Sequence, residues 1–270
     1  GAGAARISAA GGIPVEVDVF DRDELIAALV AAAPEVVVNQ LTSLPARFEP
    51  KKPDYYDANN RIRSEGGDNL IEGTAACGAR RLVTQSISFL YELGGSKVKT
   101  ETDPVNRSGP YDPTLRHEER ALADERFETV VLRYGLLYGP GTWYARDGHL
   151  AEQARSRKLP VVGKGTGITS FLHVEDAASA AVAALDGVEG IFNVTDDEPA
   201  AMSEWVPVFA QAVGAKPPRR VPVWLAALVA GKQIATQAIE GRGASNAKFK
   251  AGTGWSPSIP SWRQGFFDAI

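Results

Sequence analysis

The sequence predicts an α/β fold, in which a doubly wound parallel sheet is followed by a smaller, mainly helical C-terminal lobe. Short runs rich in Val, Ile and Leu alternate with longer segments of helical periodicity in the first half of the 270 residues. Strand–helix–strand alternation predicts right-handed crossovers and parallel strands with helices on both faces. From Met202 onward the pattern indicates mainly helices.

Five short runs are predicted to be strands. Val36, Val37 and Val38 form a continuous apolar run, which is typical of a strand buried on both faces. The segment Thr-Val-Val-Leu-Arg at 129–133 has the same character. The predicted strands span residues 13–17, 35–41, 81–84, 129–133 and 190–194.

Seven longer segments are predicted to be helices. In the segment 21–33 the first turn is acidic, and Leu25, Ile26 and Leu29 lie on one stripe. In the segment 54–76 the pair Gly66-Gly67 weakens the middle. The predicted helices span residues 21–33, 54–76, 111–125, 174–185, 203–213, 223–239 and 262–269.

Composition and charge exclude several classes of function. Hydrophobic residues make up 44% and charged residues 23%, which is ordinary for a globular chain. With 29 basic and 33 acidic residues and no basic block, the chain is a poor candidate for binding nucleic acid or an anionic membrane. The single cysteine, Cys77, permits no intrachain disulfide, and the three histidines lack metal-ligand spacing. With no signal peptide or membrane-spanning run, we expect a cytoplasmic protein with a small-molecule substrate and no metal.

Six segments, taken in order, carry a resemblance to a known family. The most specific is Leu-Arg-Tyr-Gly-Leu-Leu-Tyr-Gly-Pro-Gly at 132–141, and Phe-Leu-His-Val-Glu-Asp follows at 171–176. The chain resembles the extended, here atypical, short-chain dehydrogenases/reductases of the NAD-dependent epimerase/dehydratase type. The remaining segments that carry the resemblance are residues 15–19, 36–40, 192–194 and 254–257.

The resemblance implies a Rossmann-like doubly wound sheet, a nicotinamide cofactor (NAD or NADP) and a division into two units. A nucleotide-binding domain would comprise residues 1–141 with 171–194, and a substrate lobe would comprise residues 142–170 with 195–270. Many members are dimers through a helix pair, so a homodimer is expected. The residues that the resemblance implies at the cofactor are Asp18, Val19, Leu41, Thr42, Tyr134, Gly135 and Leu136.

The family's opening strand, glycine-rich turn and helix have no counterpart in these residues. That turn brings backbone N–H groups to the pyrophosphate, and the strand after it distinguishes NAD from NADP. Residues 1–6, Gly-Ala-Gly-Ala-Ala-Arg, are expected to be a linker or disordered loop. Without the central first strand, neighbouring strands would expose unpaired N–H and C=O groups. Residues 1–270 alone are therefore expected to be poorly soluble or molten.

The catalytic Tyr-x-x-x-Lys motif of the family is altered. Tyr111 matches the tyrosine that acts as general acid/base, and Glu119 stands eight residues later as in the family. The lysine position, however, is Leu115. Ser86 or Ser88 could supply the hydroxyl that assists the tyrosine. Tyr111 could instead merely begin a helix or line the cleft, and the serines could make local turn hydrogen bonds.

The substrate side of the predicted site is aromatic and weakly charged. Where nucleotide-sugar members carry an arginine, this chain has Thr169 and Ser170. Arg242 could still bind an anion. The loop Thr142, Trp143, Tyr144 adds aromatic surface beyond the carboxyl edge of the sheet, although core packing is the competing use of these rings.

These features together predict an NAD(P)-dependent oxidoreductase or epimerase-type enzyme that acts on a small carbonyl or alcohol metabolite. The loss of the motif lysine leaves an alternative open, a catalytically inactive nucleotide-binding sensor or scaffold of the same fold. A non-redox epimerase, dehydratase or cyclase is the third candidate.

Overall fold

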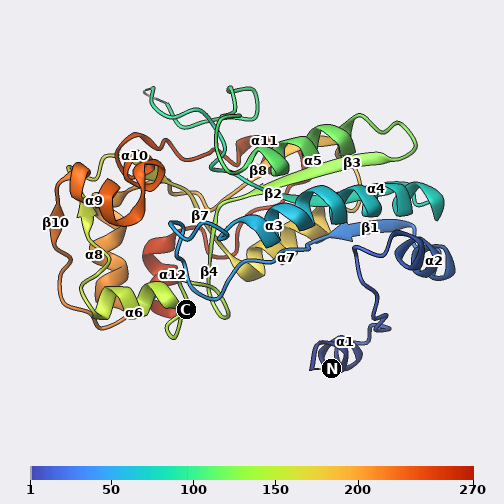
Figure 1. Ribbon diagram of the computed structural model, residues 1–270, viewed down its shortest axis with the longest axis horizontal. Helices are drawn as coiled ribbons and strands as arrows, with labels where there is room; N and C mark the ends of the chain where they lie inside the picture. Colours follow the sequence, from blue (N-terminus) through green and yellow to red (C-terminus); the bar gives the residue numbers. More distant parts are fainter. Residues whose placement is uncertain (1, 96) are drawn as a thin grey trace.

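A four-stranded parallel sheet forms the centre of the molecule, and its strand order is β1-β2-β3-β8 (Figure 1). The computed structural model describes residues 2–95 and 97–270. The runs at 36–38 and 129–133 are confirmed as strands, with β3 between two neighbours and β1 at one edge. The strands are β1 (Val36–Asn39), β2 (Arg81–Ile87), β3 (Glu128–Tyr134) and β8 (Gly190–Val194).

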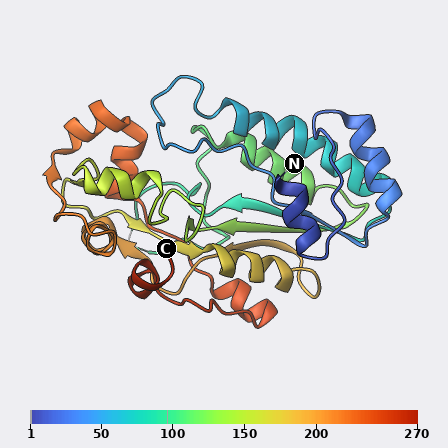
Figure 2. The same ribbon diagram turned by 90° about the horizontal axis from the view of Figure 1, so that it is seen from below.

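Helices cover both faces of this sheet, so the doubly wound prediction is confirmed (Figure 2). Successive side chains of a strand point to opposite faces. Leu82 packs in one hydrophobic cluster with residues of α2 (Arg22–Ala32), α4 (Gly67–Ala76) and α5 (Asp112–Leu122). The next residue, Val83, packs with residues of α7 (Val174–Ala183) and α11 (Ala247–Thr253) on the other face.

The helix predicted over 54–76 forms, but it contains a π turn. It consists of α3 (Asp57–Arg61), the π turn η1 (Ile62–Gly66) and α4. The turn ends at the glycine pair that the sequence marks as weak. A Cβ on Gly67 would lie 2.5 Å from Nδ1 of His117, so glycine is required where this helix approaches α5.

The second lobe packs around a group of aromatic side chains. Tyr144, Phe171, Trp205, Phe209 and Phe266 share one core cluster. Among the helices of the described residues, none combines the length and the apolarity that crossing a membrane requires. Further helices are α6 (His149–Arg155), α8 (Met202–Ala212), α9 (Val223–Ala230), α10 (Lys232–Glu240) and α12 (Trp262–Asp268). Further short strands are β4 (Leu136–Tyr138), β5 (Val161–Val162), β6 (Ile168–Thr169), β7 (Phe171–His173), β9 (Ala200–Ala201) and β10 (Arg220–Val221).

Three expectations about elements are wrong. Residues 13–17 form no strand: Ile13 is 90% exposed and Val15 61%, because no neighbouring strand pairs with them in the described residues. Residues 1–6 are expected to be a linker or disordered loop, but residues 2–6 belong to the Ala-rich helix α1 (Ala2–Ala9), which lies apart from the sheet in Figure 1. The helix predicted over 223–239 breaks at Gly231, whose φ of 97° separates α9 from α10.

Candidate active site

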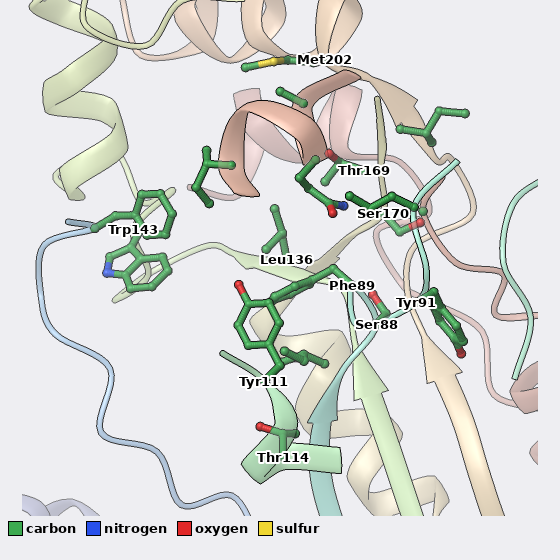
Figure 3. Close-up of a pocket in the computed structure, with 18 of the residues that line it drawn as sticks. Ser88, Phe89, Tyr91, Tyr111, Thr114, Leu136, Trp143, Thr169, Ser170 and Met202 are labelled. Atoms are coloured by element: carbon green, nitrogen blue, oxygen red, sulfur yellow. The ribbon is translucent and has the colours of Figure 1, made fainter. Parts of the chain in front are cut away.

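A cavity of about 280 Å³ lies at the carboxyl ends of β1, β2 and β3, between the sheet and the second lobe (Figure 3). Thr42 follows β1, Ser88 follows β2 and Leu136 follows β3, and all three line the cavity. Met202 and Gln237 line it from the second lobe. Because open α/β sheets bind ligands at this edge, the cavity is the candidate active site.

A connected set of aromatic rings forms one wall of the cavity. The Phe48 and Trp143 ring centroids are 5.0 Å apart, and Phe48 is 6.0 Å from Tyr55. Tyr55 lies 4.8 Å from Tyr56, which lies 5.9 Å from Tyr111. Most of these contacts are edge-to-face, the geometry that aromatic pairs prefer. The wall suits a flat, aromatic ligand.

Tyr111 immediately precedes α5, and its hydroxyl is directed into the cavity (Figure 3). Burial raises the pKa of Tyr111 well above its ordinary value, and the neighbouring phenols of Tyr56 and Tyr55 raise it further. Leu115, at the expected lysine position, is a buried apolar side chain. Tyr111 is therefore a protonated phenol whose surroundings oppose its ionisation.

The two candidate serines have different positions. Ser88 lines the cavity, whereas Ser86 does not and donates its hydroxyl to the buried carboxylate of Glu118. Arg133 completes this buried group, with Nε 3.0 Å from Glu118 Oε1. Glu119, the expected motif residue, lies at the surface and pairs there with an exposed arginine.

Glu118 is buried and Glu119 is exposed, so two registers of the motif on α5 can be compared. Eight positions before Glu118 stands Pro110, and four before it stands Thr114, which lines the cavity. In the expected register the lysine position is Leu115. Neither register places a cation on α5 at this point.

The buried ion pair also holds a second tyrosine of the cavity. Arg133 Nη1 donates to the Tyr91 hydroxyl at 3.0 Å, and this hydroxyl donates to Asn193 Oδ1 at 2.8 Å. Burial raises the pKa of Tyr91. Its hydroxyl is thus engaged in the polar network beneath the cavity.

Three of the predicted cofactor residues follow the strand ends. Thr42 and Leu136 line the cavity, and the Thr42 hydroxyl donates to Asn59 Oδ1 at 3.0 Å. The Leu41 carbonyl accepts a hydrogen bond of 2.8 Å from Gln85 Nε2. This contact ties the loop after β1 to β2.

The other four predicted cofactor residues do not line the cavity. Tyr134 is buried, with its hydroxyl bonded to a backbone carbonyl of α7 at 3.3 Å. Gly135 packs against the backbone of Ser170 and Phe171, and a Cβ at this position would lie 2.9 Å from their carbonyl oxygens. Asp18 accepts a backbone N–H within its own turn, and Val19 packs near Gly66.

The four predicted substrate residues also separate. Trp143 and Arg242 line the cavity. Tyr144 lines it too, but its ring belongs to the aromatic core of the second lobe, so the packing alternative applies to it. Thr142 does not line the cavity, because its hydroxyl closes a turn by donating to the Gly139 carbonyl at 2.8 Å.

Lys99, Arg242 and Glu92 are charged side chains that line the cavity. The Lys99 N–H donates to the Gly243 carbonyl at 3.2 Å, which places Lys99 beside Arg242. No sequence motif distinguishes Lys99, Phe48, Tyr55 or Tyr56, although Tyr55 and Tyr56 lie on the segment between β1 and α3, at the edge of the sheet where ligands bind.

Among the described residues, no three His, Cys, Asp or Glu side chains group as metal ligands would.

Comparison with known proteins identifies the family. The model of the NAD dependent epimerase/dehydratase family matches residues 3–195. The chain belongs to the NAD-dependent epimerase/dehydratase family. It is 45% identical over 260 residues to a 3-diazoavenalumate denitrifying reductase of a Streptomyces species, a match that covers 93% of this chain and 84% of the relative. It is 31% identical over 178 residues to a 2-alkyl-3-oxoalkanoate reductase of Stenotrophomonas maltophilia, covering 59% of this chain and 53% of that protein.

Solved structures of the same family share the fold. UDP-glucose 4-epimerase of Thermotoga maritima, crystallised with UDP-glucose, has a TM-score of 0.73 and 18% identity, covering 95% of this chain and 82% of the other. The Thermus thermophilus UDP-glucose 4-epimerase, in complex with NAD, has a TM-score of 0.71 and 23% identity over 95% of this chain and 83% of the other. A human epimerase family protein with NADPH has a TM-score of 0.67 and 20% identity, covering 90% and 85%.

As a member of the NAD-dependent epimerase/dehydratase family, the protein is an NAD(P)-dependent enzyme of the oxidoreductase or epimerase type, with NAD or NADP as its cofactor. The cavity fits the nicotinamide end of such a cofactor. Loops from three adjacent parallel strands converge on it, and Ser88 and Thr114 place hydroxyls among its aromatic and aliphatic side chains.

Proposed function

We propose that the protein is an NAD(P)H-dependent reductase of small aromatic acids, which replaces a diazo group on the ring by hydrogen. The Streptomyces relative, matched along 93% of this chain, is named as a reductase of this kind. The observation that carries the proposal is the cavity, whose aromatic wall surrounds a tyrosine that stays protonated.

This reaction makes little demand on a proton donor. In the diazonium form of the substrate, the bond between the ring carbon and nitrogen breaks, and its electron pair leaves with dinitrogen. When bound, the reduced nicotinamide supplies the hydride that forms the new carbon–hydrogen bond, and it is oxidised in exchange. A hydride delivered to the cationic diazonium would leave the product neutral, so the protein's residues would not have to supply a proton. Carbonyl reduction, in contrast, needs a proton on oxygen.

The lining residues would divide the work among themselves. Thr42, Ser88 and Leu136, at the strand ends, would hold the nicotinamide end of the cofactor. The aromatic wall would bind the substrate ring and exclude water. Arg242 and Lys99 would bind the carboxylate, because a guanidinium suits the planar geometry of that group.

A substrate panel tests the proposal. NAD(P)H oxidation and dinitrogen release would be followed with a diazo-hydroxycinnamate, with the same diazo ring lacking the carboxylate, and with a 2-alkyl-3-oxo acid. We expect the diazo acid to be turned over, and its neutral analogue to have a KM about tenfold higher. Arg242→Gln should raise the KM of the acid about tenfold and leave that of the neutral analogue unchanged. Lys97→Gln, in the same loop as Lys99, is the matched control and should change neither.

A carbonyl reductase is the second candidate, because Tyr111 and Ser88 both line the cavity and one relative is named an oxoalkanoate reductase. Turnover of the oxo acid without reaction of the diazo acid would replace the first proposal by this one. Cofactor binding without turnover of either would favour the nucleotide-binding sensor. A cytoplasmic location and a homodimer stay predictions.

A further inference from the structure

Arg63 lies in the π turn of the long helix and points inward. π turns are rare, and they often mark functional sites. Arg63 is 5% exposed and lines the cavity. Its neighbours Arg61 and Glu65 lie on the outside of the same helix and pair with each other, with Nε 2.6 Å from Oε2. The π turn thus separates one arginine that faces the cavity from one that faces solvent.

The guanidinium of Arg63 has donors to spare. It carries five N–H bonds. Nη1 donates to the Gln85 carbonyl at 2.9 Å, whereas Nε has no partner within the described part of the chain. Burial lowers the pKa of Arg63 to about 10, so the group remains a cation at neutral pH. A buried cation with unpaired donors is costly unless a ligand accepts from it.

The position of Arg63 corresponds to the missing lysine. The π turn η1 packs against α5. Thr114 and Leu115 stand on α5 where the family's lysine would be in its two registers, and neither is charged. Thr114 and Arg63 line the same cavity. The cation absent from α5 is therefore present on the helix that packs against it.

We propose that Arg63 binds the ribose hydroxyls of the nicotinamide nucleotide, in place of the motif lysine. A guanidinium can donate two parallel hydrogen bonds to adjacent hydroxyl oxygens. The ammonium of a lysine on α5 could also donate to them, but its donors are less fixed in direction. The inference rests on the family's cofactor and not on the proposed substrate. In this arrangement the ribose would be held without a cation on α5, and the pKa of Tyr111 stays raised by burial and the neighbouring tyrosines.

The test is cofactor affinity in the full-length protein, measured by calorimetry with NADH and NADPH. Arg63→Gln should weaken the binding of the preferred cofactor about tenfold. Adding Thr114→Lys to that variant should restore at least half of the loss on a logarithmic scale, because it returns a cation to the family's position. Arg61→Gln removes an arginine from the outer face of the same helix and should bind cofactor like the wild type.

Thermal unfolding without cofactor separates binding from a structural role. An Arg63→Gln protein that melts at a lower temperature but binds cofactor normally would overturn the proposal. So would an increase in the substrate KM alone, which would assign Arg63 to the substrate. If the glutamine variant does not fold, Arg63→Lys decides: a folded protein with weaker cofactor binding supports the proposal, and unchanged binding contradicts it.

Discussion

Tyr111 has the position of a proton donor, since its hydroxyl is directed into the cavity that Ser88 also lines (Figure 3). Its environment is unlike that of a proton donor. Desolvation and two neighbouring phenols raise the pKa of Tyr111, so that its anion is unfavourable. A reaction that depends on Tyr111 as an acid would be slow, whereas a hydride transfer to a diazonium would not depend on it.

The substitution Tyr111→Phe distinguishes these cases. It removes one hydroxyl and keeps the ring that contacts Tyr56 and Phe89. We expect kcat for the diazo acid to fall less than about fivefold, because general acid catalysis, which contributes ~10²–10⁴-fold where it operates, is not used. A loss in that larger range at unchanged cofactor affinity would contradict this and would identify Tyr111 as the acid.

Counting from Tyr111 places Leu115 at the lysine position of the motif and Glu119 at its acidic position. The structure adds that the adjacent Glu118 is buried and paired with Arg133, which spacing does not reveal. Adjacent glutamates are indistinguishable in a linear pattern when the helix register is unknown. Arg63 carries no motif either, because its inward direction depends on a π turn that a helical periodicity does not reveal.

At the scale of elements, α5 is joined to the sheet and to α4 through His117. Its Nε2 lies 2.9 Å from Thr84 Oγ1, and its ring occupies the space left by Gly67. Burial, together with the positive charges of Arg63 and Arg120, lowers the pKa of His117 to about 4. The histidine is therefore neutral in the folded protein at any pH near neutrality.

This gives stability a specific dependence on pH. In the unfolded chain a histidine has a pKa of about 6.5, so between pH ~6.5 and ~4 the unfolded state binds the extra proton. Protonation of the unfolded chain at His117 therefore lowers the free energy of unfolding as the pH falls from ~6.5 to ~4, by about 3 kcal/mol in total. Above pH ~6.5 this loss is absent. His117→Gln should be less stable at neutral pH but should lose less stability on acidification. Denaturant unfolding at several pH values measures this.

His149→Gln is the matched control. Desolvation and Arg47 lower the pKa of His149 too, but this histidine is only partly buried, so its variant should change the acid loss less than His117→Gln does. An equal loss of unfolding free energy in wild type and His117→Gln between pH 7 and 4 would contradict the assignment.

The sequence predicted elements well where a run was either continuously apolar or strongly periodic. β1, β3 and α7 follow from such patterns. The segment 13–17 has the β-branched residues of a strand, but a strand needs a hydrogen-bonded neighbour, and the described residues offer none beside it. Residue type alone does not reveal whether a partner is present.

At the scale of the whole molecule, β1 is an edge of the sheet within the described residues. Val38 on this strand is 41% exposed. An apolar edge with unpaired N–H and C=O groups is a template for association with other chains. We expect the 270-residue chain to self-associate, as measured by light scattering after size-exclusion chromatography.

Val38→Lys should increase the monomer fraction of that protein, because a charge on an exposed edge disfavours edge-to-edge pairing. Val182→Lys is the matched control: Val182 is exposed on the helix α7 rather than on an edge strand, so its substitution should leave association unchanged. A monomer of residues 1–270 with a cooperative, high-temperature melt would contradict the edge as the cause.

The order of motifs along the chain was sufficient to predict the family, the fold and the cofactor class. The composition of the cavity was not predictable to the same extent. Its wall combines Phe48 and Tyr55, after β1, with Trp143, after β4. Lys99 and Arg242 stand on loops that are distant in the sequence, and backbone hydrogen bonds join these loops. Convergence of this kind depends on tertiary structure, so the sequence named Trp143 and Arg242 but not their partners.

The destination of the cofactor's hydride tests the central claim most directly. The full-length protein would be supplied with a diazo-hydroxycinnamate and nicotinamide cofactor deuterated at the reactive carbon, and dinitrogen and product would be analysed by mass spectrometry. We predict one dinitrogen released for each cofactor oxidised and one deuterium on the ring carbon that carried the diazo group. Oxidation of the cofactor without release of dinitrogen, or transfer of deuterium only to a carbonyl carbon of an oxo acid, would contradict the account.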